Sequence, residues 1–581
     1  MKSIYDEFKK IALKNSGKKA LLFKSNSKWN YIKYGRLFKN VNNLAQSFLY
    51  LGIKTQDNVA ILCENRPQWL MSDLALNKIG AVLVPIHVTT NPKEMDFILD
   101  DSKSDFLIVS KKLCKKHFEY FVNKKRIKKI ILIGKNIDKE KFSQKFYFFQ
   151  DLVEDCDKKV LEKRLKKGSN EVRSNNNNDR EIFGQTANLN KSRLLSTIIY
   201  TSGTTGIPKG VRLNNFNFLS NVIAVKKRIR ITKNDKFLSF LPLSHVLERT
   251  AGSYVPILSG SAIAYCTNIK KLSKELKEVN PTVIIAVPKI FERVYEKIFT
   301  QIKKKNRLIK KIFFWSIKNN KNFIQKKLAE YLILRQLRNQ IFGSHLRFAV
   351  SGGAGINKNI IKFFKNIGVA IIEGYGLTET SPIISANSLK SSKIGSVGKK
   401  LSNLKIKLAP DKEIMVKGPS VTEGYWQRQD LNQEVFEQDW FKTGDLGFLD
   451  KEGFLTIIGR KKEIIVTSNG KNIPPEKIEC LLNINPLIDQ SLVSGNRKKY
   501  LTAIIIPNKS LRKKPYDQVK KQIRKQLNKI NKELEHFERI RDFQILFDPF
   551  TIEEGELTAT LKVKRKVIEA KYKDLIEKMY R

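Results

Sequence analysis

The sequence predicts an α/β protein with a large N-terminal domain of layered αβ sheets, built from several subdomains, and a small mobile α+β C-terminal domain. Short apolar runs at 58–64, 81–87, 105–110 and 129–134 alternate with helix-like stretches such as 67–80. That alternation is typical of buried parallel strands joined by helices. The chain has 581 residues, which exceeds one folding unit at roughly 150 residues per domain.

The domain boundaries follow from changes in composition along the chain. The α/β pattern occupies residues 1–459, and a separate α+β unit is expected at 460–581, where strand-like segments precede a long charged helical stretch. A polar, Asn-rich insertion at about 168–191 predicts an exposed loop. A basic insertion at about 296–345 predicts helices.

The chain is strongly basic. Lys and Arg total 110 against 56 Asp and Glu, so the formal net charge is +54. A surplus of this size predicts attraction to nucleic acid, anionic lipid or small molecules that carry phosphate. Drift in genomic base composition explains the same bias without any polyanionic partner, and the charge does not decide between these explanations.

Several function classes are excluded by missing patterns. The five cysteines are far apart with no CxxC pair, so we expect neither disulfides nor a thiolate zinc site. Free cysteines of this kind are typical of a reducing compartment, so we expect a cytoplasmic location. The five histidines form no HExxH motif. No apolar run reaches the length of about 18 residues that spans a membrane. No nucleic-acid-binding motif occurs, so we expect no nucleic-acid partner.

Residues 301–330 hold ten Lys or Arg and one acidic residue, interleaved with Ile, Leu, Phe and Trp. One interpretation is a set of basic amphipathic helices at the surface of an anionic membrane, which would place the protein peripherally at the inner face of that membrane. The other is a solvated helical face that packs on the large domain. Both interpretations stay open.

A phosphate-binding loop is the strongest chemical signal. A buried strand at 196–200 runs directly into the segment TSGTTGIPKG, which ends at Gly210. Glycines let successive backbone N–H groups face one point, while hydroxyls and a Lys add donors and positive charge. The spacing differs from that of a Walker loop. The candidate nucleotide-binding residues are Thr201, Ser202, Gly203, Thr204, Thr205, Gly206 and Lys209.

Together with six further segments, this loop resembles the adenylate-forming superfamily, which includes acyl-CoA synthetases, luciferases and adenylation domains. The further segments occur in the order of that family: LPLSHVLER at 241–249, SGGAGI at 351–356, EGYGLTET at 373–380, WFKTGDLG at 440–447, IIGRKKEIIVTSNGKNIPPEKIE at 457–479 and LTATLKVKRK at 557–566. The basic insertion and the C-terminal segment resemble those of long-chain fatty acyl-CoA synthetases. The resemblance implies the adenylate-forming fold over nearly the whole chain.

The resemblance also implies a reaction. A fatty acid carboxylate attacks the α-phosphorus of ATP with Mg²⁺ present, pyrophosphate leaves, and the thiol of CoA then displaces AMP from the acyl-adenylate. The implied activity is that of a long-chain fatty acid–CoA ligase. A fatty acyl–acyl-carrier-protein synthetase has the same nucleotide motifs and remains the main alternative. A nucleic-acid-binding protein and an inactive scaffold are the alternatives from other classes, and the intact motif residues argue against the scaffold.

Segment 373–380 has implied roles residue by residue. Gly374 and Gly376 allow the backbone to approach the nucleotide. Tyr375 offers a flat face to adenine. Thr378 donates to the α-phosphate, and Glu379 is the implied Mg²⁺ ligand.

Two other segments complete the implied nucleotide site. Asp445, expected in a tight turn, is implied to accept hydrogen bonds from the ribose hydroxyls, and Arg460 is implied to donate a hydrogen bond to the ribose. Gly353 and Ala354 form a wall beside adenine with their backbone groups.

The remaining roles concern the acyl group and the second step. Lys562 is implied to reach the carboxylate and α-phosphate only during adenylation. Residues 460–462, with Lys462 at the family's hinge position, join the two domains, and Gly470 would line the path of the thiol. His245 borders the implied acyl pocket.

Overall fold

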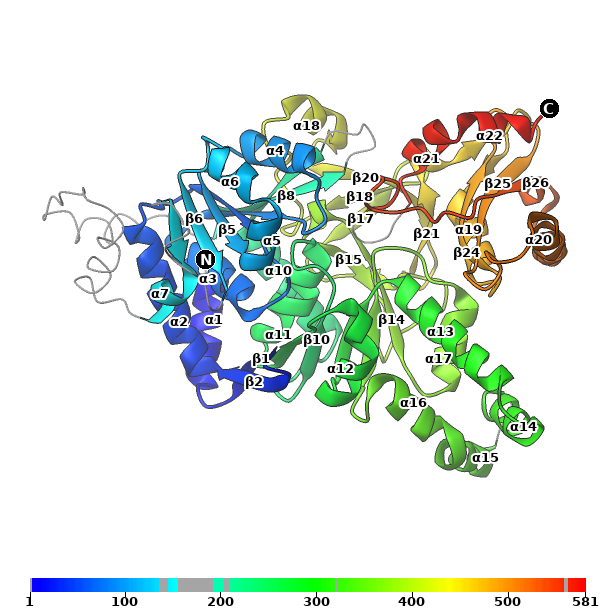
Figure 1. The fold of residues 1–581 in the computed structure, drawn as a ribbon, viewed down its shortest axis with the longest axis horizontal. Helices are drawn as coiled ribbons and strands as arrows, with labels where there is room; N and C mark the ends of the chain where they lie inside the picture. Colours follow the sequence, from blue (N-terminus) through cyan, green and yellow to red (C-terminus); the bar gives the residue numbers. More distant parts are fainter. Residues whose placement is uncertain (1–2, 135–144, 155–191, 203–207, 319–321, 559–562) are drawn as a thin grey trace, which may run out of the picture.

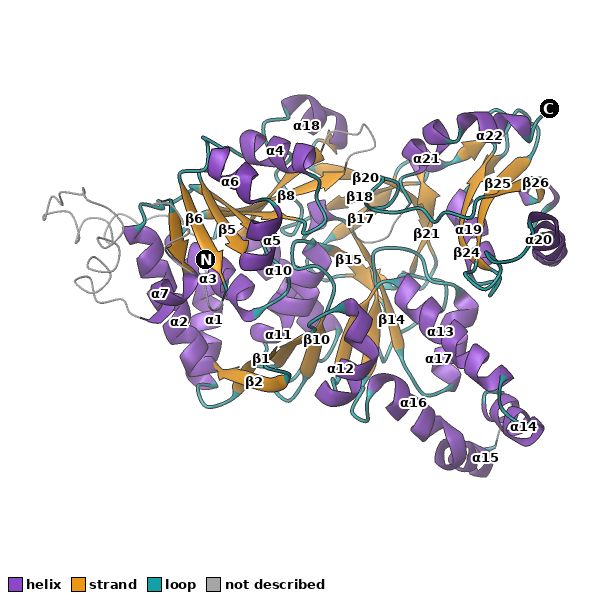
Figure 2. Ribbon diagram, viewed as in Figure 1, coloured by secondary structure: helices purple, strands orange, loops and turns teal. Residues whose placement is uncertain are grey.

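The structure is a computed structural model that describes residues 3–134, 145–154, 192–202, 208–318, 322–558 and 563–581. It confirms the predicted fold class: layered, largely parallel sheets with helices form the larger part, and a smaller α+β part follows at the C-terminus (Figures 1 and 2). The polar insertion expected at about 168–191 lies outside the described residues.

A seven-stranded sheet near the N-terminus contains all four strands predicted from the apolar runs. Its strands lie in the order β7-β6-β5-β3-β4-β8-β9, and all neighbours are parallel except β8 and β9. Val59 and Ile61 of β3 enter one hydrophobic cluster, while Ala60 and Leu62 enter another on the opposite face. Burial on both faces explains why these strands are continuously apolar.

The strands of this sheet are β3 (Asn58–Leu62), β4 (Val82–Ile86), β5 (Phe106–Ser110), β6 (Lys129–Ile133), β7 (Phe146–Phe148), β8 (Leu195–Ser202) and β9 (Pro208–Asn214). The accompanying helices are α1 (Ile4–Lys14), α2 (Tyr34–Tyr50), α3 (Pro67–Ile79), α4 (Pro92–Asp101), α5 (Lys111–Lys116), α6 (Phe118–Asn123) and α7 (Phe149–Glu154).

A nine-stranded sheet forms the second layer system, in the order β16-β15-β14-β13-β12-β10-β11-β1-β2. Its central strands are parallel, and antiparallel strands lie at both edges. The strands are β1 (Lys19–Ser25), β2 (Lys28–Lys33), β10 (Lys236–Ser239), β11 (Ala262–Tyr265), β12 (Val283–Ala286), β13 (Phe348–Ser351), β14 (Ile371–Gly376), β15 (Ile383–Ala386) and β16 (Lys399–Lys400).

Helices and helical turns connect the strands of this second sheet. They are α10 (Asn215–Arg228), the π-helical turn η2 (Glu248–Tyr254), α11 (Val255–Ile257), η3 (Ile269–Lys271), α12 (Leu272–Val279), α13 (Pro288–Lys303), α14 (Arg307–Ser316), α15 (Phe323–Ala329), η4 (Glu330–Leu334), α16 (Arg335–Phe342), α17 (Lys358–Asn366) and η5 (Thr378–Thr380). Within the described ranges, no helix combines the length and the apolar character that crossing a bilayer requires.

Smaller sheets complete the fold, and residues from Ile465 onward form two hydrophobic clusters of their own. An antiparallel sheet contains β17 (Lys405–Leu408), β18 (Glu413–Lys417), β19 (Phe436–Glu437), β20 (Trp440–Leu449) and β21 (Leu455–Arg460), with α18 (Gln429–Val435) beside it. The remaining elements are η6 (Lys461–Glu463), β22 (Ile465–Val466), β23 (Asn472–Ile473), α19 (Pro475–Asn483), β24 (Ile488–Ser494), β25 (Leu501–Pro507), α20 (Tyr516–Asn531), η7 (His536–Glu538), β26 (Ile540–Ile545), α21 (Arg565–Lys571) and α22 (Lys573–Lys578).

A buried ion pair joins the two large sheets. The guanidinium of Arg249 in η2 donates to both carboxylate oxygens of Asp73 in α3, at 2.6 and 3.0 Å, and neither side chain is exposed to solvent. Tyr254 also donates to Asp73, and Arg249 donates to the hydroxyl of Thr197 in β8. Because a buried charge is costly unless it is paired, this network holds the two sheets in one relative position.

Glu248, the neighbour of Arg249, is also fully buried. Its side chain packs so closely on Gly252 that a Cβ added there would lie 2.6 Å from the carboxylate. Burial raises the pKa of Glu248 to about 8. The side chain is therefore protonated in the folded protein at neutral pH.

Replacing Asp73 with Asn should destabilise the protein by about 3–5 kcal/mol, because the charge of Arg249 stays buried without its partner. The expected observation is a lower midpoint in urea unfolding followed by far-UV circular dichroism. Asp439→Asn is the matched control, since Asp439 forms an exposed ion pair with Lys417 at 2.7 Å, and its loss should cost roughly 0–1 kcal/mol. Equal effects of the two substitutions would contradict the role given to the buried pair.

Glu248→Gln should alter the pH dependence of stability. Between its unfolded pKa of 4.5 and its folded pKa of about 8, Glu248 holds a proton only in the folded state, so its contribution to stability decreases as the pH rises through that window. Glutamine removes this decrease. The urea midpoint of Glu248→Gln minus that of the parent protein should therefore increase from pH 5 to pH 8. For the control Glu119→Gln, at an exposed position, the corresponding difference should not change with pH.

Candidate functional site

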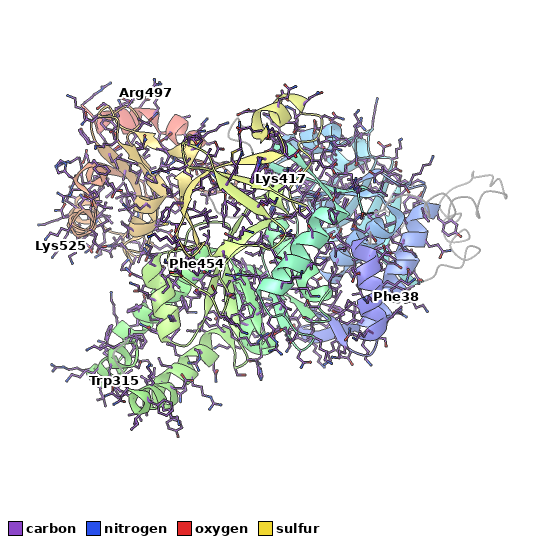
Figure 3. The ribbon with its side chains drawn as sticks, turned by 180° about the vertical axis from the view of Figure 1, so that it is seen from behind. Phe38, Trp315, Lys417, Phe454, Arg497 and Lys525 are labelled. Carbon is purple, nitrogen blue, oxygen red and sulfur yellow. The ribbon has the colours of Figure 1, made fainter. Side chains whose placement is uncertain are left out.

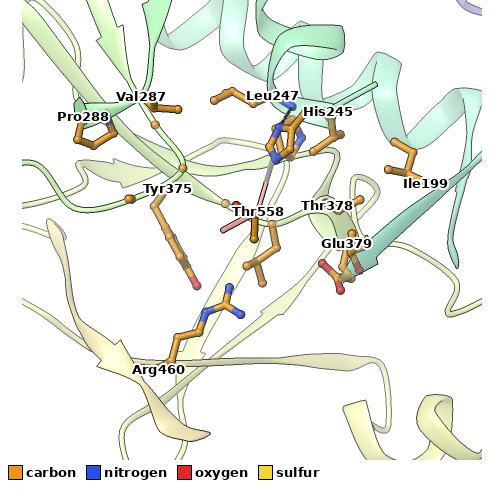
Figure 4. Close-up of a pocket in the computed structure, with 18 of the residues that line it drawn as sticks. Ile199, His245, Leu247, Val287, Pro288, Tyr375, Thr378, Glu379, Arg460 and Thr558 are labelled. Atoms are coloured by element: carbon orange, nitrogen blue, oxygen red, sulfur yellow. Dashed lines mark hydrogen bonds between the residues drawn. The ribbon is translucent and has the colours of Figure 1, made fainter. Parts of the chain in front are cut away.

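One cavity of about 1460 Å³ lies where the carboxyl ends of the parallel strands meet the C-terminal part of the chain. Tyr375, Thr378, Glu379 and Arg460 surround it together with Thr558 (Figure 4). Ligands commonly bind at the carboxyl ends of parallel strands, because the connecting loops and the strand ends open there. Most of the residues singled out from the motifs lie on the walls of this cavity.

The predicted phosphate-binding segment begins at the end of β8. β8 and β9 form an antiparallel hairpin in which Thr201 lies opposite Lys209, and both residues line the cavity. Ser202 is the last residue of β8. Gly203, Thr204, Thr205 and Gly206 lie outside the described residues.

A tyrosine that the motif analysis missed connects two candidate catalytic residues. The hydroxyl of Tyr425 donates to Glu379 Oε1 at 2.8 Å, and Lys209 Nζ lies 5.5 Å from the centre of the Tyr425 ring. Burial raises the pKa of Tyr425, and the charge of Glu379 adds to that rise. Tyr425 thus remains a hydrogen-bond donor and orients Glu379. The only sequence signal is its place in GYW at 424–426, after a glycine.

The hairpin of β14 and β15 brings the next motif to the cavity wall. Gly374, Tyr375, Gly376, Thr378 and Glu379 all line the cavity. Gly376 permits a close contact between the two strands, since a Cβ there would lie 1.8 Å from the carbonyl oxygen of Pro382. Only glycine fits that position.

Asp445 contacts Tyr375 and Arg460, two residues that line the cavity, but it is not in the tight turn that was expected. It lies within β20, one residue after Gly444, whose φ of +71° kinks the strand. Its carboxylate accepts from the Tyr375 hydroxyl at 2.7 Å and lies 3.2 Å from Arg460 Nε. The strand pairing sets this geometry, because β21 places Arg460 directly opposite Asp445. The sequence spacing of 15 residues did not indicate it.

Gly353 and Ala354 lie on the loop after β13 and line the same cavity. Gly353 has a φ of +88°, a left-handed conformation that favours glycine. Val287 approaches within 3.8 Å of a Cβ built at Gly353, so the loop and the residue after β12 form one wall.

An apolar channel extends from this wall along one face of the nine-stranded sheet. Val283 pairs in register with Phe348, and Ile285 pairs with Val350, so alternate residues of two adjacent strands face the cavity. Val283 and Val287 are four residues apart along the chain, so the extended segment between them is about 13 Å long. Other lining residues of the channel are Val225 of α10, Ile229 directly after that helix, Ala251 of η2 and Val255 of α11.

His245 also lines the cavity, at its boundary with this channel. Its Nδ1 accepts from the backbone N–H of Leu247 at 3.2 Å, which orients the ring just before the helical turn begins. The next residues, Val246 and Leu247, line the cavity as well, and the role of His245 at the acyl group stays a prediction.

A second histidine was not singled out from the sequence. His87 follows β4, the neighbour of β8, and lines the cavity. Burial lowers its pKa to about 4, so the ring is neutral at physiological pH. Among the described residues, neither ring nitrogen has a hydrogen-bond partner. A neutral imidazole here can donate to or accept from a ligand in the cavity.

The predicted hinge at 460–462 spans the end of β21 and the start of η6, and ion pairs hold its two lysines. Lys461 Nζ lies 2.5 Å from Asp411 and 2.9 Å from Glu413, and Lys462 Nζ lies 3.1 Å from Glu434. The hydrogen bonds to these carboxylates raise the pKa of Lys461 to about 12, that to Asp411 most strongly.

Of the two residues assigned to the alternation of domains, one is described by the structure and does not line the cavity, and the other falls outside the described residues. Gly470 occupies a turn with a φ of +71° and is not among the cavity-lining residues. Lys562 lies outside the described residues, although Thr558 and Val563 on either side of that segment both line the cavity.

No group of three or more His, Cys, Asp or Glu side chains suited to a metal occurs in the described part of the chain. Glu379 is a single carboxylate that already accepts one hydrogen bond. This donor set fits Mg²⁺, which usually takes one or two carboxylates together with substrate phosphates and water.

Comparison with protein families identifies two matching regions. A model described as AMP-binding enzyme matches residues 8–426, and one described as AMP-binding enzyme C-terminal domain matches residues 462–581.

Curated relatives match over most of their length. The chain is 31% identical to the long-chain-fatty-acid–CoA ligase FadD15 of Mycobacterium bovis, with 95% of this chain and 92% of the relative covered. It is 28% identical to the chloroplastic long-chain-fatty-acid–[acyl-carrier-protein] ligase AEE15 of Arabidopsis thaliana, with 94% and 82% covered.

Among solved structures, o-succinylbenzoate coenzyme A synthetase of Bacillus subtilis, in complex with ATP and a magnesium ion, shares the fold. Its TM-score is 0.68 at 22% identity, and 96% of this chain and 98% of that chain are covered.

Glu379→Gln should weaken the binding of Mg²⁺ and so lower turnover at limiting Mg²⁺, because an amide cannot supply the negative charge that the ion requires. We expect the Mg²⁺ concentration for half-maximal pyrophosphate release to rise roughly 10- to 100-fold, and Tyr425→Phe, which only loosens Glu379, to raise it by about 10-fold. Glu94→Gln is the matched control, because Glu94 also lines the cavity but has no part in the proposed nucleotide site or hinge. An unchanged Mg²⁺ requirement in Glu379→Gln would refute the proposed ligand.

Proposed function

Because the chain belongs to the AMP-binding enzyme family, we propose that it activates long-chain fatty acids with ATP and transfers them to CoA. The acid first becomes an acyl-adenylate with release of pyrophosphate, and the CoA thiol then displaces AMP. The observation that carries the proposal is the single cavity in which polar strand ends meet an apolar channel. A ligase relative at 31% identity over most of both chains supports the same activity.

Adenylation requires two negatively charged reactants to be brought together. The carboxylate and the triphosphate are both anionic, so the site must neutralise their repulsion and the charge that develops on pyrophosphate. Lys209 supplies positive charge, with Thr201 beside it. Thr378 donates to the α-phosphate, and Glu379 would hold Mg²⁺, which neutralises charge on the phosphates when it is bound. Lys562 is proposed to add a positive charge during this step alone.

The nucleoside is proposed to lie against β14 and β20. Asp445 keeps lone pairs available for the ribose hydroxyls while Tyr375 and Arg460 hold it in place. The backbone of Gly353 and Ala354 faces adenine, and the ring of Tyr375 supplies the flat surface.

The channel supports a long apolar substrate. Its lining on the sheet side consists of Val, Ile and Phe side chains in register. A short or charged acid would leave this apolar surface in contact with water, whereas an alkyl chain buries it, at about 0.8 kcal/mol for each CH₂ group. The carboxylate end then lies at the carboxyl ends of β12 and β13, next to His245.

The second step requires the C-terminal part to change position. Breaking the pairs of Lys461 and Lys462 with Asp411, Glu413 and Glu434 would release the hinge at 460–462. These pairs are partly exposed, so each contributes little and the rotation is accessible. Gly470 is proposed to enter the thiol path after this rotation.

The thiol acceptor distinguishes two activities. CoA is the acceptor we propose, because FadD15 is a CoA ligase and matches at higher identity than AEE15, which is named as an acyl-carrier-protein ligase. Acyl carrier protein is the alternative that the basic surface favours, since carrier proteins are acidic.

The proposal is tested with the purified chain, ATP, Mg²⁺ and a series of fatty acids of increasing length. We expect pyrophosphate release with long-chain acids alone and AMP release once CoA is added. Lys562→Ala should abolish pyrophosphate release, while Lys573→Ala, at an exposed position that does not line the cavity, should not. Absence of pyrophosphate with every acid would overturn the proposal, and faster AMP release with carrier protein than with CoA would favour the alternative acceptor.

Val283→Phe should shorten the longest fatty acid that the enzyme accepts, since the larger ring would fill the distal end of the channel. Turnover of short acids should remain, and the drop for long acids should be at least tenfold, as measured by pyrophosphate release. Ile284→Phe is the matched control, because Ile284 faces the opposite hydrophobic cluster and carries the same overpacking cost of about 1–3 kcal/mol. An equal effect on long acids would contradict the position of the channel.

A further inference from the structure

The helices α14, α15, η4 and α16 form a projection that extends from the body of the protein (Figures 1 and 3). We call residues 303–318 and 322–338 the helical projection. Its inner side is anchored, because Phe313, Ala329 and Leu334 are buried in the hydrophobic cluster that lies against the nine-stranded sheet. The projection is therefore a packed part of the fold with a separate outer side.

The outer side exposes an unusual number of large apolar side chains. The described chain has twenty exposed large hydrophobic residues, and seven of them lie in this short region. They are Leu308, Phe314, Phe323, Ile324, Leu328, Tyr331 and Leu332. Phe323, Ile324 and Tyr331 are each more than 70% exposed. A dense group of exposed apolar residues marks a surface that is covered by a partner.

The same region is strongly basic. Exposed Lys and Arg residues surround the apolar group: Lys303, Lys304, Lys305, Arg307, Lys311, Lys318, Lys326, Lys327 and Arg335. Glu330 is the one acidic residue of the projection, and Arg338 Nη1 donates to its carboxylate at 2.7 Å. The projection thus presents a large positive charge to any partner.

The basic and apolar side chains are interleaved. Lys327 Nζ, for example, lies 4.7 Å from the centre of the Phe323 ring. A lysine placed beside an apolar residue can keep its ammonium at a polar layer while its neighbour enters an apolar one. This mixture is typical of helices that lie in the interface of a membrane.

We propose that the helical projection docks on the surface of an anionic lipid bilayer. Its Lys and Arg residues pair with lipid phosphates, and its exposed Phe, Ile, Leu and Tyr side chains enter the headgroup region. A second copy of this chain would bring the same positive charge to the contact and be repelled. A nucleic acid would pair with the charge but leave the apolar side chains exposed.

The projection is connected directly to the cavity by α13. Pro288, Lys289 and Glu292 at the start of this helix line the cavity, and its last residue, Lys303, begins the projection. The helix has 16 residues, a length of about 24 Å. A bilayer bound at the projection would therefore lie at a set distance from the cavity, whatever acid the cavity accepts.

The test is co-sedimentation of the full chain with phosphatidylcholine vesicles, with and without phosphatidylglycerol, in the absence of ATP and fatty acid. We expect binding only to the vesicles that contain phosphatidylglycerol, and weaker binding at high salt. The triple variant Lys304→Glu, Lys311→Glu, Lys327→Glu should reduce the partition coefficient at least about 100-fold. The matched control changes Lys521, Lys525 and Lys529 of α20 to Glu, with the same change of net charge.

A second variant separates the apolar contribution from the charge. Phe323→Ser with Ile324→Ser and Tyr331→Ser should also weaken binding, while Phe448→Ser with Leu449→Ser, two exposed residues on β20, should not. Unaltered circular dichroism spectra verify that each variant folds. Absence of binding by the parent chain, equal binding to both vesicle types, or equal losses in the projection and control variants would overturn the proposal. Since no substrate is present, these outcomes are independent of the ligase activity.

Discussion

The buried contact between Arg249 and Asp73 is the interaction on which the arrangement of the large domain depends. It joins α3, which packs on the seven-stranded sheet, to η2, which covers the nine-stranded sheet. Thr197 of β8 enters the same network, so the strand that leads to the phosphate-binding segment is connected to the cover of the apolar channel. A buried bidentate pair tolerates little displacement. The polar and apolar halves of the cavity are therefore held in a fixed position relative to each other.

Within that frame, each half of the cavity has its own source of specificity. Parallel strands end at one edge, where loops and helical turns supply hydroxyls, a lysine and carboxylates that a nucleotide can meet. Farther along β12 and β13, alternate residues face the same cavity, and the pairing of Val283 with Phe348 makes this face continuously apolar. The nine-stranded sheet thus provides the apolar wall and part of the polar edge, while Thr201 and Lys209 come from the seven-stranded sheet.

The C-terminal part and the helical projection are attached to this frame in different ways. The C-terminal part has its own hydrophobic clusters and is fastened near the hinge by partly exposed ion pairs, which a rotation can exchange at low cost. The helical projection is fastened by buried Phe313, Ala329 and Leu334 and keeps its relation to the cavity. The two parts are therefore held by contacts of different kinds: ion pairs near Arg460 hold the C-terminal part, and buried apolar packing holds the helical projection.

The sequence by itself determined the elements and the chemistry. Apolar runs of strand length predicted β3 to β6, and the family motifs singled out residues that line the cavity, among them Thr378, Glu379 and Arg460. These features are local, because strand periodicity and motif spacing are written in adjacent residues. Pairings between distant segments were decided only by the tertiary structure. Asp445 lies in a strand opposite Arg460, Tyr425 orients Glu379 across 46 residues, and Arg249 meets Asp73 across 176. Such contacts depend on register and packing, which no local pattern encodes.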